Sequence, residues 1–110
     1  MVPKSVNKIS TMTVSNKFSK IDLNTYVISG NVVHLTFRGK LKEAILNDEV
    51  ILSKIPLAAI SDTFSFLTSP DNYGANSTVR WGYLKNGVSL ATGAIAKDTW
   101  VHISYTYIKA

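Results

Sequence analysis

The sequence predicts an all-β fold: a single antiparallel β-sandwich, jelly-roll-like, with about seven or eight strands. Three observations predict it. Short runs of β-branched and aromatic residues alternate with polar ones, and Gly, Pro, Asn and Asp separate the runs. An Asn86-Gly87 pair between two such runs is typical of a two-residue hairpin. The 110 residues, 45% hydrophobic and 17% charged, suffice for one packed core but not for two.

The first 20 residues are predicted to be a polar, basic arm with room for one short strand, and residues 21–110 the sandwich module. Four lysines precede the first acid of the chain, namely Lys4, Lys8, Lys17 and Lys20. Most of the net charge of +5 therefore lies in the arm, and the module is close to neutral.

The strands of the first half of the module follow from alternation. A strand at 26–28 turns at 29–31 into a second strand at 31–38, whose core face carries Val33, Leu35 and Phe37. The window 40–49 has helix-compatible spacing but no N-cap, so it favours a strand continuation and turn. Apolar residues at 50–52 predict the next strand, and Pro56 closes it.

The second half begins with a strand at 61–67 that directs Phe64 and Phe66 to the core. The hairpin around 86–87 pairs Tyr83 with Leu90, which predicts that Trp81, Tyr83 and Val79 face the core. In the last strand, 99–108, the core positions are Val101, Ile103, Tyr105 and Tyr107. Trp100 then faces the other way, either into a second layer or onto a ligand or oligomer surface. No internal repeat is evident.

Composition excludes several classes of function. The chain contains no cysteine, which removes disulfide scaffolds, thiol nucleophiles and thiolate metal sites. No apolar run is long enough for a membrane span, and no secretory signal is recognisable, so we expect a protein made in the cytoplasm without export. The chain has two arginines that could contact phosphates, Arg38 and Arg80, and no predicted strand face interleaves basic with aromatic residues. We therefore expect no nucleic-acid partner.

Catalytic and metal chemistry is weakly supported. Nearly all the acids fall in predicted turns, where Asp bonds its own backbone. His34 and His102 would meet only if their strands are neighbours, and no third ligand is apparent. No glycine pair has the spacing of a phosphate-binding loop. We expect no enzyme activity, no cofactor and no metal; a small glycan-active enzyme is the weakest alternative.

Binding is better supported, at two candidate patches. The loop that carries Asp71, Asn72, Tyr73 and Asn76 offers amide and carboxylate groups for hydroxyls and a ring for an apolar sugar face, although an ordinary polar loop has the same composition. The second candidate patch is formed by Trp100 and His102 of the last strand, with Arg38.

Two stretches carry a resemblance to a known protein class. The strand from Val27 to Gly39 is followed by an apolar strand that ends in Lys54-Ile55-Pro56. Gly93-Ala94-Ile95-Ala96 then precedes an aromatic strand from Thr99 to Ile108. Over residues 21–108 the chain resembles the C-terminal head modules of tail-tip, baseplate and receptor-binding proteins of siphophages that infect Gram-positive bacteria, including small stand-alone tail-region proteins of Bacillus phages.

The resemblance implies a compact, commonly trimeric head in the virion tail. Its partners would be other tail proteins and a host cell-wall saccharide, and its role attachment to the host or organisation of the tail tip. Such heads usually follow a long shaft, whereas only about 20 residues precede this module, and no binding residue carries over. The alternative is an accessory protein of a prophage lysis region, associated with membrane or cell wall through the basic arm.

Overall fold

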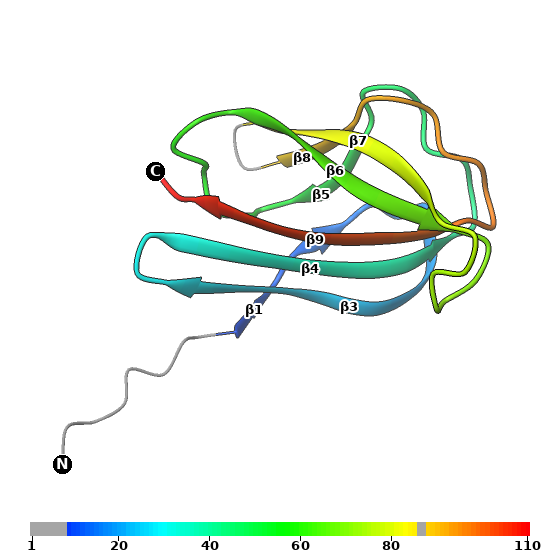
Figure 1. Ribbon diagram of the computed structural model, residues 1–110, viewed down its shortest axis with the longest axis horizontal. Coiled ribbons are helices and arrows are strands. Elements are labelled where there is room, and N and C mark those ends of the chain that lie inside the picture. The colour runs from blue at the N-terminus through cyan, green and yellow to red at the C-terminus, as the bar shows by residue number, and fades with distance from the viewer. Residues whose placement is uncertain (1–8, 86–87) are drawn as a thin grey trace, which may run out of the picture.

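The computed structural model describes residues 9–85 and 88–110, and all its regular elements are strands (Figure 1). They are β1 (Ile9–Thr11), β2 (Thr13–Val14), β3 (Phe18–Ser29), β4 (Val32–Leu41), β5 (Val50–Ser53), β6 (Asp62–Ser69), β7 (Thr78–Lys85), β8 (Val88–Ala91) and β9 (Trp100–Ile108). The described part of the chain contains no helix that could cross a membrane. The all-β, antiparallel, sandwich-like fold predicted from the sequence is confirmed.

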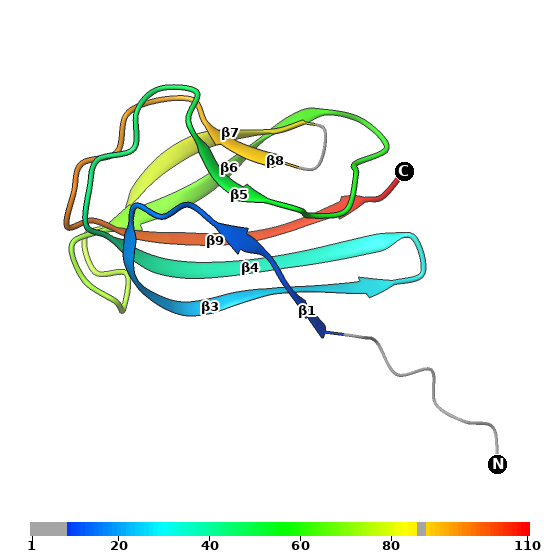
Figure 2. The same ribbon diagram turned by 180° about the vertical axis from the view of Figure 1, so that it is seen from behind.

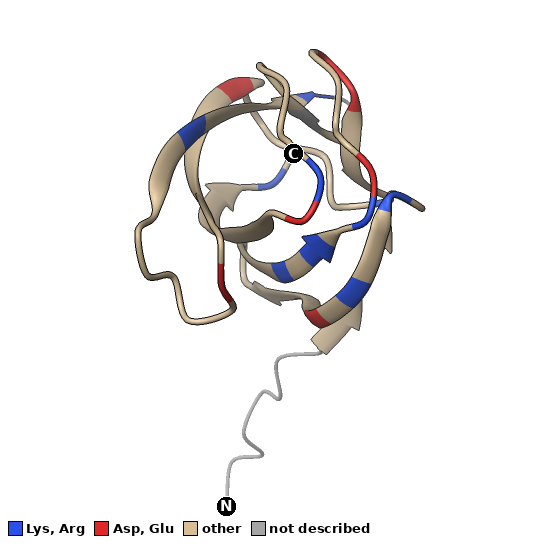
Figure 3. Ribbon diagram, turned by 90° about the vertical axis from the view of Figure 1, so that its right-hand side faces the viewer, with Lys and Arg blue, Asp and Glu red and all other residues tan. Residues whose placement is uncertain are grey.

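The strands run in the hydrogen-bonded order β1-β3-β4-β9-β6-β7-β8-β5-β2, and every pairing is antiparallel. The two outermost strands, β1 and β2, are consecutive in the chain and separated only by Met12. The sheet therefore curls round until its edges meet at this residue, as the view along the strands shows (Figure 3). Met12 is buried, and its amide donates to Asn24 Oδ1 at 2.9 Å, which replaces the ladder bond lost at the crossing.

The core lies between the two layers formed by this curling. Strands β5 and β8 lie behind β6 in Figure 1 and in front of it in Figure 2. The predicted core faces of β4, β6 and β9 are confirmed, since Val33, Phe37, Phe66 and Ile103 are all buried in one cluster. The window 40–49 continues β4 and then turns, also as predicted.

The described strands form two Greek keys in succession. In the first Greek key, residues 9–53, β1/β2, β3 and β4 form a meander, and β5 returns to pair with β2. In the second Greek key, residues 62–108, β6, β7 and β8 form the meander, and β9 returns to pair with β6. The two are joined reciprocally, β4 with β9 and β8 with β5. Exchanging the keys leaves the strand order unchanged, so the domain has an internal pseudo-two-fold axis.

The axis passes between two loops, residues 42–49 and 92–99, which we call the twin connections. The Ile45 amide donates to the Ile95 carbonyl at 2.9 Å, and the Ile95 amide donates to the Ile45 carbonyl at 2.8 Å. Two further pairs of backbone hydrogen bonds are related in the same way, by adding or subtracting 50 in the residue numbers. In the first pair, the Asp48 amide donates to the Ala91 carbonyl and the Asp98 amide to the Leu41 carbonyl. In the second pair, the Leu41 amide donates to the Thr99 carbonyl and the Ala91 amide to the Glu49 carbonyl. The two loops run side by side at one end of the molecule (Figures 1 and 2).

The twin connections also share sequence, which corrects the expectation that the chain holds no repeat. Ala44-Ile45 is followed by Asp48 at the same spacing at which Ala94-Ile95 is followed by Asp98. Both isoleucines are fully buried, and both aspartates have positive φ, 61° and 63°. Three matching residues are too few to stand out in a sequence, but the isoleucines and aspartates among them occupy positions that the fold constrains.

The orientation predicted for β7 is wrong. The register with β8 is as expected, Tyr83 opposite Leu90, while residues 86–87 lie outside the described part. However, Trp81 is 59% exposed and Val79 57% exposed. The neighbour β6 decides the face: its buried Phe64 and Phe66 lie opposite Gly82 and Arg80, so the even-numbered positions of β7 turn inward and the apolar odd-numbered ones outward.

The structure places the start of the domain earlier in the chain than the predicted boundary at residue 21. Strands β1 and β2 and the first residues of β3 all fall before residue 21 and are paired within the sheet. Residues 9–20 therefore belong to the domain, because without β1 and β2 the sheet could not close.

Candidate binding groove

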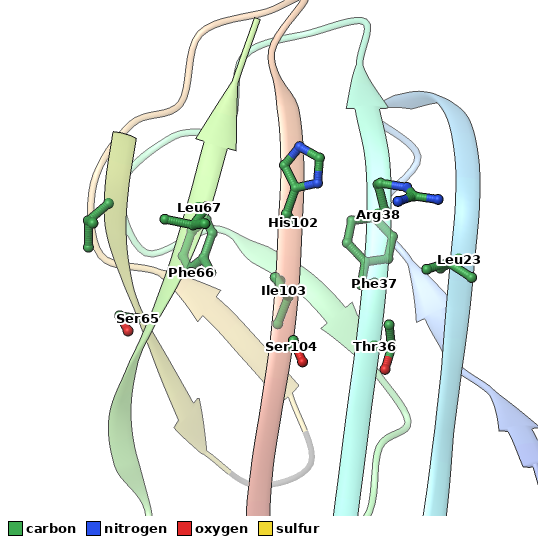
Figure 4. A pocket seen from close by; sticks show the side chains of 11 residues that line it. Leu23, Thr36, Phe37, Arg38, Ser65, Phe66, Leu67, His102, Ile103 and Ser104 are labelled. Atoms are coloured by element: carbon green, nitrogen blue, oxygen red, sulfur yellow. The ribbon is translucent and has the colours of Figure 1, made fainter. Parts of the chain in front are cut away.

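An open groove of about 460 Å³ crosses the outer face of the sheet formed by β3, β4, β9, β6 and β7 (Figure 4). Strands β6 and β9 are paired only from Leu67 opposite His102 to Ser69 opposite Trp100. Before Leu67 in the chain, β6 is no longer paired with β9, whereas it remains paired with β7 from Asp62 to Thr68. The groove lies at this point of the sheet.

One transverse row of outward-facing residues marks the groove. Strand register places Val79 opposite Leu67, Leu67 opposite His102, His102 opposite Arg38, and Arg38 opposite Leu23. Four strand spacings of ~4.8 Å make the row about 19 Å long. Its ends are apolar and its middle is cationic and aromatic, so the row suits an elongated amphipathic ligand.

A second row of hydroxyl side chains lies one pleat along the strands. The groove is lined there by Thr36, Ser65 and Ser104, and none of the three is buried. Trp81 lies opposite Ser65 on the same outer face, and Val79 borders both the groove and the small hollow beside Trp81. An exposed indole next to a band of hydroxyls is a surface on which a sugar ring can stack and hydrogen-bond.

Arg38 is incompletely satisfied. Its Nε is buried and has no hydrogen-bond partner among the described residues. The Asp22 carboxylate forms an ion pair with it at 3.8 Å from Nε to Oδ2, too long for a hydrogen bond. A buried donor without an acceptor costs roughly 1–3 kcal/mol, so this guanidinium is poised for an additional acceptor.

His102 joins the groove to the loop of the first candidate patch. Its Nε2 lies 2.7 Å from Ser69 Oγ, and Ser69 Oγ donates its single proton to the Asp71 carbonyl at 2.6 Å. The imidazole must therefore donate from Nε2, which leaves Nδ1 as an acceptor in the neutral ring. Ser69 is buried and its proton is committed, so this Ser–His contact does not have the geometry of an exposed nucleophile with its base.

The loop 70–77 holds itself together with the groups that the sequence suggested for a ligand. Asp71 Oδ1 accepts from the amides of Tyr73 at 3.0 Å and Ala75 at 3.1 Å. Asn76 has φ 57°, a turn conformation, and the Tyr73 ring is 94% exposed. Asn72 Oδ1 is buried without a described partner. Tyr73 is thus the side chain of this patch most open to a partner.

Trp100 lies on the outer face, as predicted, but is only 7% exposed and does not belong to the main core cluster. Lys20 covers it, with Nζ 5.8 Å from the ring centroid, and Lys40 and Ser69 are its neighbours on the adjacent strands. Of the second candidate patch, the structure therefore brings His102 and Arg38 together in the groove and leaves Trp100 as a covered support beside them.

The two histidines do not meet. Their strands are neighbours, but His34 pairs with Thr106, whose Oγ1 lies 3.1 Å from Nδ1, and His102 pairs with Arg38. Four residues along a strand separate the two sites by about 13 Å. Within residues 9–85 and 88–110, no group of His, Asp and Glu could hold a metal ion.

The lysis-accessory alternative depends on the lysines of the predicted basic arm, of which the structure describes Lys17 and Lys20. Lys17 Nζ forms a salt bridge with Glu49 Oε1 at 2.7 Å and donates to the Ala44 carbonyl at 3.1 Å. The hydrogen bond from Lys17, followed by that from the Leu46 amide, lowers the pKa of Glu49. Lys20 covers Trp100. Lys4 and Lys8 lie outside the described residues.

Known proteins give no further indication of function: no protein-family model, no curated protein and no solved structure matches this chain. The groove and the indole beside it were missed at the level of sequence because the exposed residues Leu67, Val79 and Trp81 resemble core residues. The signal that would have found it is the pairing of β7 with β6.

Proposed function

We infer that this chain is a non-catalytic binding module of the phage-tail type, in which the outer-face groove takes a saccharide of the host cell wall. The observation that carries this proposal is the combination of exposed Trp81, the row of hydroxyl side chains and the Arg38–His102 pair on one open face. Carbohydrate sites need this mixture of an aromatic platform and convergent polar groups.

The virion setting is part of the same proposal and follows from the resemblance of residues 21–108 to siphophage head modules. The partners would be other tail proteins and further copies of this chain, with a trimer favoured. Light scattering of the purified protein measures this directly: a mass of about three chains supports the head-like assembly, and a monomer favours a purely tail-organising part.

A pull-down on purified Gram-positive cell walls tests the groove. We expect Trp81→Ala to weaken wall binding at least tenfold, because the platform for the sugar ring is lost. Ile60→Ala is the matched control, since Ile60 is also exposed but lies in the connection between β5 and β6, away from the groove. Tyr73→Ala tests the loop 70–77 separately.

Equal wall binding by Trp81→Ala and the native protein would contradict the groove as the saccharide site. If Tyr73→Ala alone reduced binding, the site would move to the loop. If Trp81→Ala instead changed the mass measured by light scattering, the exposed face would be an interface between copies and not a saccharide site.

A further inference from the structure

The end of the groove next to Arg38 is positively charged, which the binding of a neutral saccharide would not require. Three cationic side chains lie on neighbouring outer-face positions of β3 and β4, because Lys20 is opposite Lys40 and Arg38 is one pleat away. Asp22 is the acid that forms an ion pair there. Basic segments gather on these adjoining strands (Figure 3). The local field at this end therefore favours an anion.

Arg38 is the residue best suited to hold that anion. Its side chain is 37% exposed while its Nε is buried and lacks an acceptor, and Asp22 Oδ2 stays 3.8 Å away. A guanidinium presents its donors as a planar fork that matches two oxygens of a phosphate or carboxylate. Because Nε is buried, an oxyanion in the groove would bind the exposed part of the guanidinium, for which the described residues provide no hydrogen-bond acceptor.

His102 and the hydroxyl row define what the anion is attached to. The imidazole lies between Arg38 and Leu67, with one nitrogen turned toward the strand of Arg38 (Figure 4). Since Nε2 donates to Ser69, the remaining Nδ1 accepts, and an acceptor beside an anion site selects a neighbouring hydroxyl of the ligand and not a second negative charge. Hydroxyls next to an oxyanion are a feature of acidic or phosphorylated sugars.

We propose that the Arg38 end of the groove is an oxyanion subsite and that the ligand of this protein is an anionic saccharide, one that carries phosphate or carboxylate groups. Arg38 binds the oxyanion, His102 Nδ1 accepts from an adjacent hydroxyl, and Lys20 and Lys40 supply the surrounding positive field. This inference rests on the proposed function, because it specifies the chemistry of the ligand in the same groove.

Titration calorimetry with three probes tests it: a poly(glycerol phosphate) wall polymer, a polyglucuronate and neutral dextran. We expect the first two, or one of them, to bind at least tenfold more tightly than dextran, and the stronger of the two identifies the source of the charge. Arg38→Gln should lose this preference at least tenfold, and Arg38→Lys should restore it only in part, because lysine keeps the charge without the fork. Raising the salt concentration should weaken binding of the anionic probes alone.

Arg80→Gln is the matched control, since Arg80 is the other arginine of the chain and does not line the groove; its Nε donates to Thr68 Oγ1 at 3.3 Å. The midpoint of thermal unfolding of each variant shows whether it is folded. Equal affinity of Arg38→Gln and Arg80→Gln for the anionic probes overturns the subsite. If cell walls bind through Trp81 and neutral dextran competes as well as the charged polymers, the proposed function stands and this inference fails; if no wall or polymer binds, the proposed function fails as well.

Discussion

The two Greek keys share one strand plan but differ in length at four places. Strands β3 and β4 have 12 and 10 residues, whereas their counterparts β7 and β8 have 8 and 4. Strand β9 has 9 residues where β5 has 4. The link from β6 to β7 spans residues 70–77, and its counterpart from β2 to β3 spans only residues 15–17. The enlarged strands β3, β4 and β9 contribute Leu23, Thr36, Arg38, His102 and Ser104 to the groove.

This division indicates where the fold is constrained and where it can vary. The twin connections share three matched pairs of backbone hydrogen bonds and carry the same Ala-Ile and Asp positions, because each completes the backbone bonding of the other. The long strands and the loop 70–77 lie away from the axis, where additional length extends the outer face without disturbing the core.

The strongest test of the comparison is to truncate the two isoleucines on the axis. Ile45 and Ile95 are both fully buried and bonded to each other through their backbones. Ile45→Ala and Ile95→Ala should each lower the free energy of unfolding by about 2–5 kcal/mol, and by similar amounts. Chemical denaturation measures both. Losses that differ by more than about 2 kcal/mol would show that the keys are not energetically equivalent.

Twin positions with different residues should respond in opposite directions. Gly39 and Ser89 are related by the shift of 50 residues. A Cβ on Gly39 would lie 2.9 Å from the Lys20 carbonyl and 3.0 Å from the Phe18 ring, so Gly39→Ala should cost about 1–3 kcal/mol. Ser89 Oγ is buried without a described partner, so Ser89→Ala should gain about 1 kcal/mol. Destabilisation by both variants in urea would contradict this contrast.

The aspartates of the twin connections provide a smaller, symmetric effect. Asp48 and Asp98 hold φ of 61° and 63°. Alanine at either position should cost about 1 kcal/mol, since Asp tolerates the left-handed region better than Ala does. The glycine variants are the controls and should be at least as stable as the alanine variants in thermal unfolding. An effect at only one of the two positions would break the symmetry.

The smallest expected effect is a pH-dependent contribution to stability that only the first Greek key has at this twin position. Glu49 pairs with Lys17, whereas its twin Thr99 carries no charge. Because the pKa of Glu49 is lowered in the folded state, the pair contributes stability above the pKa of an unfolded glutamate and loses it as the pH falls through the lowered value. Lys17→Met should therefore cost less than about 1 kcal/mol at pH 7, and less again at low pH, where Glu49 is protonated and only the bond to the Ala44 carbonyl is lost. Equal costs at both pH values would assign the loss to packing and not to charge.

Much of the fold could be predicted because each strand carries its own alternation. The faces of β4, β6 and β9 follow from Phe37, Phe66 and Ile103 without knowledge of their neighbours. The candidate site was predicted in part: Arg38 and His102 lie together, but Trp81 was assigned to the core. In β7 both faces carry apolar residues, so alternation alone could not decide which face turns inward.

The fold class, most strand positions and the inward faces of strands with one apolar side follow from the amino-acid sequence, because they depend on period-two patterning within a few residues. The orientation of β7, the closure at Met12, the twin connections and the transverse row from Val79 to Leu23 emerge from the three-dimensional structure alone. These features depend on register between strands that lie far apart in the chain, and a shift of one residue would turn every side chain to the opposite face.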